Sequence, residues 1–236
     1  MNTNIIARSR FPSIIVAALT ALTVVAFART YYLRFLFDLP PLNRAGHIHG
    51  LISTLWLVLH YTQARLIAAH RIALHKRLGI VTACVGLLLV VHGFGMVIDG
   101  VVAGRAPPGR DPLQFLAVPI GSLVLFSLFL GSALTLRKRR EWHKRLMLLA
   151  TFTLLLPAAG RIDTLIMVPL GLPRAVLGFW LTFAFVAWAW MHDWRKLGRV
   201  HAAYIIGGIL LLASIPARRQ FGMSEAWIPI ANWLTS

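Results

Sequence analysis

Histidine is concentrated in one apolar stretch of this chain. Five of the nine histidines fall between residues 45 and 79, namely His47, His49, His60, His70 and His75. A neutral imidazole binds iron, copper or zinc through one ring nitrogen, and apolar surroundings favour the neutral ring over a charged one. Some of these histidines are therefore candidates for holding a cofactor inside a membrane.

Three histidines are predicted to line up between two neighbouring helices. Eleven residues separate His49 from His60, which is three helical turns plus about 20°, so both lie on one helix face. His92 lies on the next apolar stretch, which runs in the opposite direction, and we expect it at the depth of His49. Facing imidazoles can serve as the axial ligands of one haem iron. The pattern predicts His49 and His92 as haem ligands, with His60 as a further cofactor-binding residue.

The same residues allow two other interpretations. Each histidine could instead hydrogen-bond to a polar side chain of a neighbouring helix, for example Ser53, Thr62, Gln63 or Thr82. An outer-leaflet transition-metal site could also form from five residues, because imidazoles with carboxylates suit zinc, copper or iron. Its candidate ligands are His47, His49, His92, Asp99 and Asp163. Against this metal site, Arg161 offers Asp163 a simple ion-pair partner.

The composition indicates an integral membrane protein. The chain is 58% hydrophobic and only 13% charged, whereas soluble domains average about 25% charged residues. The net charge of +17 arises from short basic clusters between apolar runs, which is a membrane pattern and excludes a nucleic-acid partner.

The apolar runs predict an all-α membrane bundle of about seven transmembrane helices in one domain. A leading helix at 12–28 is followed by three helical hairpins, and the chain ends in a tail at the outer interface. The hairpins are expected at 48–98, 113–169 and 175–216, and the tail at 217–236. The leading stretch also resembles a cleavable secretory signal, but we expect it to be retained as a helix.

Loop charges predict the orientation. Most lysines and arginines fall on the short loops of one side, which places the N-terminus inside and the C-terminus outside a bacterial cytoplasmic (inner) membrane. Anionic lipids are expected at these inner loops, above all at Arg137–Arg140, Lys144 and Arg145. Two of the loops share R-x-x-x-H-K-R-L, at Arg71–Leu78 and Arg139–Leu146, which supports a repeated hairpin.

One longer pattern resembles a known family. It reads H-x-H-G-x5-W-x6-Q-x-x-L-I and ends in L-H-K-R-L-G, carried by His47, His49, Gly50, Trp56, Gln63, Leu66, Ile67 and Leu74–Gly79. It is similar to a pattern in bacterial multi-pass membrane proteins of unsettled function, and this resemblance implies topology rather than chemistry. A weaker similarity links the His49 and His60 pair to dihaem b-type cytochromes, although those proteins space the pair more widely.

These patterns lead to one main functional hypothesis. We expect a b-type haem protein with an electron-transfer role, which exchanges electrons with quinol or another membrane redox subunit. The alternative is a non-catalytic membrane subunit or assembly factor whose histidines only bridge helices. A transporter is disfavoured, because no predicted helix carries paired charges near mid-depth. Soluble-type catalytic motifs are absent, so the sequence leaves enzymatic activity open.

Overall fold

The protein is a bundle of helices, and a computed structural model describes residues 10–107, 109–172 and 176–236. The described part contains helices and turns but no strand. Nine α-helices follow one another there: α1 (Phe11–Phe27), α2 (Arg44–Ala68), α3 (Ile72–Val102), α4 (Pro112–Thr135), α5 (Arg140–Phe152), α6 (Leu155–Ile162), α7 (Val176–Leu197), α8 (Ala202–Gly222) and α9 (Trp227–Thr235). Short π-helical turns follow α1 at Ala28–Tyr32 and α6 at Asp163–Met167. Residue 175, where the third hairpin is expected to begin, lies outside the described residues.

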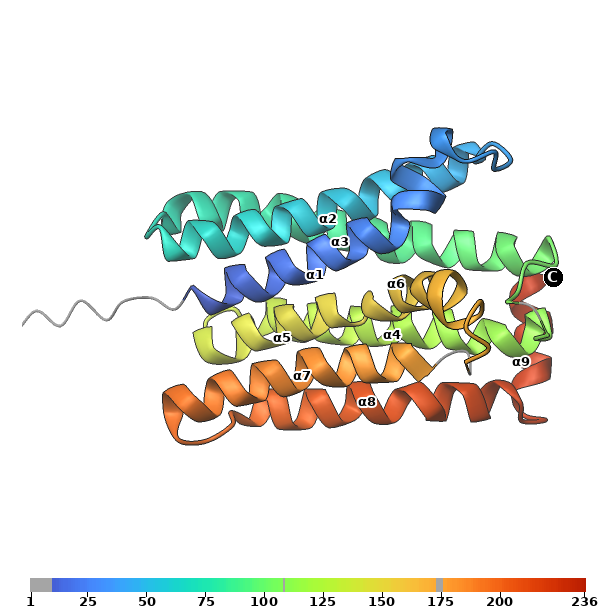
Figure 1. Cartoon of the computed structure of the whole chain (residues 1–236). Helices are drawn as coiled ribbons and strands as arrows, with labels where there is room; N and C mark the ends of the chain where they lie inside the picture. The colour runs from blue at the N-terminus through green and yellow to red at the C-terminus, as the bar shows by residue number, and fades with distance from the viewer. Residues whose placement is uncertain (1–9, 108, 173–175) are drawn as a thin grey trace, which may run out of the picture.

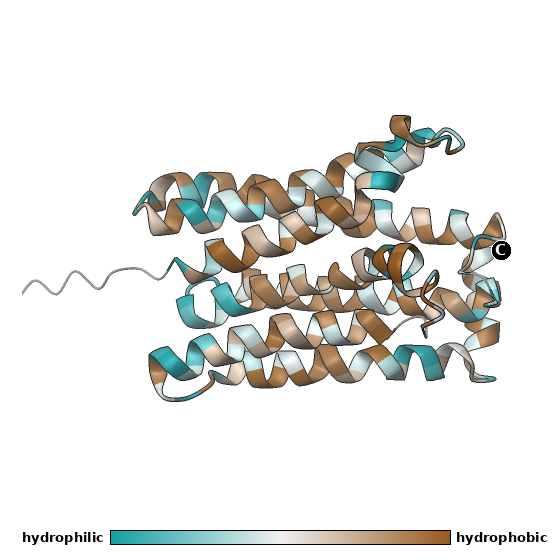
Figure 2. Ribbon diagram, in the orientation of Figure 1, coloured by the Kyte–Doolittle hydropathy of each residue, from teal (hydrophilic) through white to brown (hydrophobic). Residues whose placement is uncertain are grey.

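The long helices lie side by side and alternate in direction (Figure 1). One end of the bundle holds the start of α1 and the turns at 69–71, 136–139 and 198–201, and we call it the basic end. Hydrophilic residues gather there, while the middle of the bundle is mostly apolar (Figure 2). The opposite end holds the α1–α2 and α3–α4 connections and α9. The basic loops predicted to share one side of the membrane therefore do share one end of the structure.

Five helical stretches are long and apolar enough to cross a membrane. They are Phe11–Tyr32, Ile72–Val102, Pro112–Thr135, Arg140–Met167 and Ala202–Gly222. Large apolar side chains such as Leu87 and Ile206 point outward from them and are exposed, which suits contact with lipid. The all-helical prediction is confirmed, and the five stretches indicate a membrane protein. α2 and α7 lie alongside in the same bundle but do not belong to this set, so the count of seven stays a prediction.

Local sequence signals explain where the helices begin. The Asn43 side chain accepts a hydrogen bond of 2.8 Å from the backbone N–H of Gly46 and caps α2. Asp111 caps α4 in the same way through Gln114 N–H, at 2.9 Å. Gly198 takes a positive φ of 66° in the turn between α7 and α8, a conformation that glycine adopts without strain.

Proline accounts for the interruption between α5 and α6. Pro157 has no backbone N–H, so it cannot bond to the carbonyl of Thr153, four residues earlier. The α-helix stops at Phe152 and restarts at Leu155, next to that orphan carbonyl. The helix is therefore interrupted before Pro157, whereas α4 runs through Pro119 without interruption.

The last residues pack against protein. α8 extends through Gly222, past the expected start of the tail at residue 217. The buried Trp227 and Ala231 of α9 then pack against Leu116 and Ala117 of α4. Most of the expected tail is thus helical and closes the end of the bundle opposite the basic end.

Candidate functional site

His49 and His92 lie together between α2 and α3. Their ring centres are 5.8 Å apart and their planes differ by 24°. Both rings are half-buried, and the Nδ1 atom of each is enclosed without a hydrogen-bond partner in the described part of the chain. Buried polar atoms normally have a partner, so a pair of unsatisfied ring nitrogens calls for an explanation.

The glycines around this histidine pair are mostly covered by protein side chains. A side chain at Gly50 would collide with the ring of Tyr31, and one at Gly46 would collide with Leu42. Gly93 lies against Leu123 and against His49 itself, whereas Gly95 faces open space. The main role of Gly46, Gly50 and Gly93 is therefore to allow close packing of protein side chains. They leave no preformed space for a macrocycle beside α2.

Arg161 of α6 brings a positive charge near the histidine pair. Its guanidinium lies 3.8 Å from the centre of the Phe27 ring and donates to the Thr30 hydroxyl at 3.2 Å and to the Pro157 carbonyl at 3.0 Å. The charge is close enough to interact electrostatically with His49. In the described part of the chain, Arg161 forms these contacts and not the expected ion pair with Asp163.

The structure does not form the candidate metal site. Among the described residues, no three histidine, cysteine or acidic side chains are grouped so that they could hold a metal ion. His47 and Asp99 point outward and are exposed, whereas Asp163 is buried in the turn after α6. The short H-x-H spacing sends its two histidines in different directions, because neighbours two apart on a helix do not share a face. Only His49 and His92 of the five come together.

His60 has a protein partner of its own. It is 5% exposed, and its Nδ1 lies 2.6 Å from the hydroxyl of Thr151 on α5. Its ring also contacts Trp56, with ring centres 5.9 Å apart. These contacts give His60 the helix-bridging role that was the alternative interpretation, so it is the weakest of the three haem candidates.

A second histidine pair lies nearer the basic end. His75 of α3 and His143 of α5 have ring centres 6.5 Å apart and are nearly perpendicular, at 81°. The Nδ1 of His143 donates to the Ala133 carbonyl at 2.8 Å, since a carbonyl can only accept. The two histidines were not predicted to form a pair, although they occupy the same position of the repeated R-x-x-x-H-K-R-L motif. The repeat was the signal that could have found this pair.

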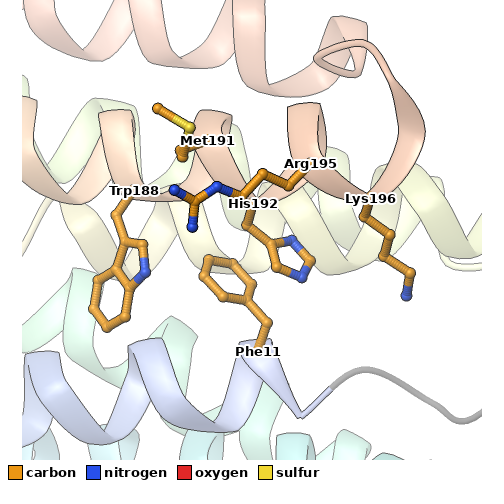
Figure 3. A pocket seen from close by; sticks show the side chains of 6 residues that line it. All are labelled: Phe11, Trp188, Met191, His192, Arg195 and Lys196. Atoms are coloured by element: carbon orange, nitrogen blue, oxygen red, sulfur yellow. The ribbon is translucent and has the colours of Figure 1, made fainter.

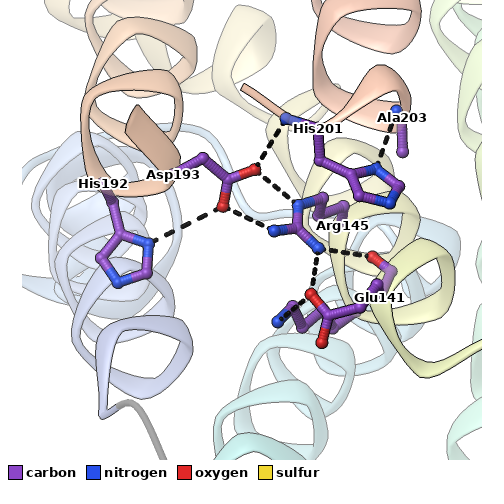
Figure 4. A network of polar contacts seen from close by, with 7 residues as sticks. Glu141, Arg145, His192, Asp193, His201 and Ala203 are labelled. Atoms are coloured by element: carbon purple, nitrogen blue, oxygen red, sulfur yellow. Dashed lines mark hydrogen bonds and ion pairs between the residues drawn. The ribbon is translucent and has the colours of Figure 1, made fainter. Parts of the chain in front are cut away.

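The basic end also contains a buried ion-pair network (Figure 4). Arg145 is 1% exposed and donates two hydrogen bonds of 2.7 Å to the carboxylate of Asp193, which is 3% exposed. Arg145 also donates to the Glu141 carboxylate at 2.6 Å, and Asp193 accepts the backbone N–H of His201 at 3.2 Å. Arg145 lies over the ring of Tyr204 at 5.3 Å. The network joins α5, α7 and α8, and it removes Arg145 from the expected lipid-facing cluster.

The chain thus contains two histidine pairs at different depths and one buried ion-pair network. Among the described residues, only the outer pair, His49 and His92, combines unsatisfied ring nitrogens on both members with a nearby cation, Arg161, for which no ion pair is seen there. No family model, curated protein or solved structure matches this chain.

Proposed function

We propose that this protein is a membrane-embedded b-type haem protein with an electron-transfer role, and that His49 and His92 are the axial ligands. The observation that carries the proposal is the pair of half-buried imidazoles, 5.8 Å apart, whose Nδ1 atoms lack partners in the described chain. Iron bound between the rings would use a nitrogen of each, and this would offset part of the cost of burying them.

The separation of the rings fits a shared metal. One metal ion could be held by both rings if a nitrogen of each were directed at it, at about 2 Å. The ring centres of His49 and His92, 5.8 Å apart, are near enough to share one metal. The surroundings fit less directly, because the side chains of Tyr31 and Leu123 cover the adjacent glycines and would have to rotate away.

Arg161 suits a cofactor that carries carboxylates. A half-buried guanidinium near the pair would stabilise an anionic group, and hydrogen bonds from a charged donor to a carboxylate are among the stronger ones in proteins. Haem b brings two propionate carboxylates. When bound, the haem would supply a one-electron carrier. Electrons would then come from quinol or from another membrane redox subunit.

Absorption spectroscopy of the purified protein tests this proposal. Protein expressed with ample haem and purified in mild detergent is expected to be red, with a Soret band that shifts and sharpens on reduction with dithionite. Extraction with pyridine and alkali then gives the amount of haem b per chain, expected at about one. Colourless protein from haem-replete cells would contradict the proposal.

The closed packing around Gly50 and Gly93 favours one alternative function. In that case the protein is a non-catalytic membrane subunit or assembly factor, and its histidines only bridge helices, as His60 does with Thr151. Colourless protein that stays folded would support this alternative.

We also propose seven membrane passes in a bacterial inner membrane, with the basic end inside. Reporter fusions after Arg140 and after Ser236 are expected to report from the cytoplasm and from the outside, because the basic loops stay inside. A reporter fused after Gly109 serves as a control for the outer side. Gly109 lies between α3 and α4, at the end opposite the basic end. Signals from the same side after Arg140 and Ser236 would contradict the seven-pass topology.

A further inference from the structure

A hollow lies between the start of α1 and the end of α7, at the basic end of the bundle (Figure 3). We call it the α1–α7 hollow. Its lining combines a mainly apolar wall of Phe11, Trp188 and Met191 with three basic side chains, His192, Arg195 and Lys196. It therefore offers an apolar surface and a cationic rim to the same ligand.

Aromatic contacts connect the two helices at this place. The ring of Phe11 stacks on His192, with centres 3.8 Å apart and planes within 8°, and meets the edge of Trp188 at 5.8 Å. α1 packs mainly on α2 and α6, while α7 packs mainly on α6 and α8. The hollow is thus a gap between two helices whose ring contacts lie at their basic ends.

The two cations at the rim are available to an external anion. Arg195 and Lys196 are exposed, and neither forms an ion pair in the described part of the chain. By contrast, Lys144 and Arg145 of the neighbouring basic loop already bind the Glu141 carboxylate. Arg195 and Lys196 therefore carry charge at the end of α7 that can attract an anion, whereas the buried Arg145 contributes none.

We propose that the α1–α7 hollow binds one anionic phospholipid of the inner leaflet. Arg195 and Lys196 would contact its phosphate, while Phe11, Trp188 and Met191 would contact the glycerol and the upper acyl chains. Charge complementarity selects this occupant, because the rim is cationic and the wall below it is apolar. The hollow lies at the basic end, which the proposed topology places at the cytoplasmic leaflet, where anionic lipids give a negative surface potential.

Native mass spectrometry of the full chain tests this proposal. Delipidated protein is titrated with phosphatidylglycerol and with phosphatidylcholine of identical acyl chains, and the first bound lipid is quantified. Arg195→Gln/Lys196→Gln is expected to weaken phosphatidylglycerol binding about thirtyfold, since each basic residue near a headgroup contributes about 1 kcal/mol and 1.4 kcal/mol is a factor of ten. Lys138→Gln/Arg139→Gln removes the same charge from exposed residues outside the hollow and is expected to leave the first site intact.

Two further measurements distinguish the apolar wall from the cationic rim. Trp188→Ala is expected to weaken the binding of both lipids by a similar factor, because it removes part of the apolar wall and no charge. Inorganic phosphate alone is expected not to displace the lipid at millimolar concentration. The proposal is overturned if the two double variants lose phosphatidylglycerol affinity equally, or if the unchanged protein binds phosphatidylcholine as tightly as phosphatidylglycerol. It is also overturned if inorganic phosphate displaces the lipid. Monodisperse elution of each variant in size-exclusion chromatography excludes misfolding as the cause.

Discussion

His49→Ala and His92→Ala are each expected to abolish the haem spectrum of the purified protein or convert it to a high-spin form. The two rings are the only half-buried imidazoles in the described chain that face each other with both Nδ1 atoms unsatisfied. In a haem-bound protein, either substitution would remove one of the two proposed imidazole ligands, which would change the Soret band and lower haem retention. Reduced-minus-oxidised spectra and the haem-to-protein ratio measure both effects.

Two histidines on the same helix provide matched controls. His47→Ala changes an exposed ring two residues from His49 and is expected to leave the spectrum and the ratio unchanged. His60→Ala removes the bond to Thr151, so it should lower the free energy of unfolding by about 1–3 kcal/mol while the haem ratio stays the same. A halved ratio in His60→Ala would instead mean that a second haem uses this residue. Normal spectra in both His49→Ala and His92→Ala would remove these residues from the ligand set.

The arrangement of the helices could largely be predicted from the sequence. Apolar runs predict which segments form the long helices, and basic loops predict which helix ends lie at the same end of the bundle. Both signals can be read from short stretches of sequence. The boundaries were less accurate, because α2 starts at Arg44 rather than at residue 48 and α8 continues to Gly222 rather than ending at residue 216. Helix ends depend on capping and on neighbouring helices, which a hydropathy window does not include.

The site was predictable in part. Helical rise places His49 and His92 at one depth, and the structure brings their rings together. Depth alone does not give rotation about the helix axis, so the expected cluster of His47, Asp99 and Asp163 around them did not form. The contact of His60 with Thr151 spans 91 positions of the chain, and no local pattern could have indicated it.

The buried Arg145–Asp193 pair leads to the largest expected change in stability. Asp193→Ala is expected to lower the free energy of unfolding by about 3–5 kcal/mol, because it leaves the Arg145 guanidinium buried without its carboxylate. Glu141 also contacts Arg145, but its side chain is exposed, so Glu141→Gln should cost less than about 1 kcal/mol. Denaturant-induced unfolding in detergent, followed by circular dichroism, measures both values.

A double substitution distinguishes the charge from the shape of the site. Arg145→Met/Asp193→Leu is expected to recover most of the stability lost in Asp193→Ala, because two apolar side chains of similar volume need no counter-ion. If the double variant is as unstable as Asp193→Ala, then hydrogen-bond geometry rather than the unpaired charge dominates. A cost for Asp193→Ala as small as that for Glu141→Gln would contradict the burial of the pair. Because this network joins α5, α7 and α8, its loss should also loosen the end of α7 that forms the α1–α7 hollow.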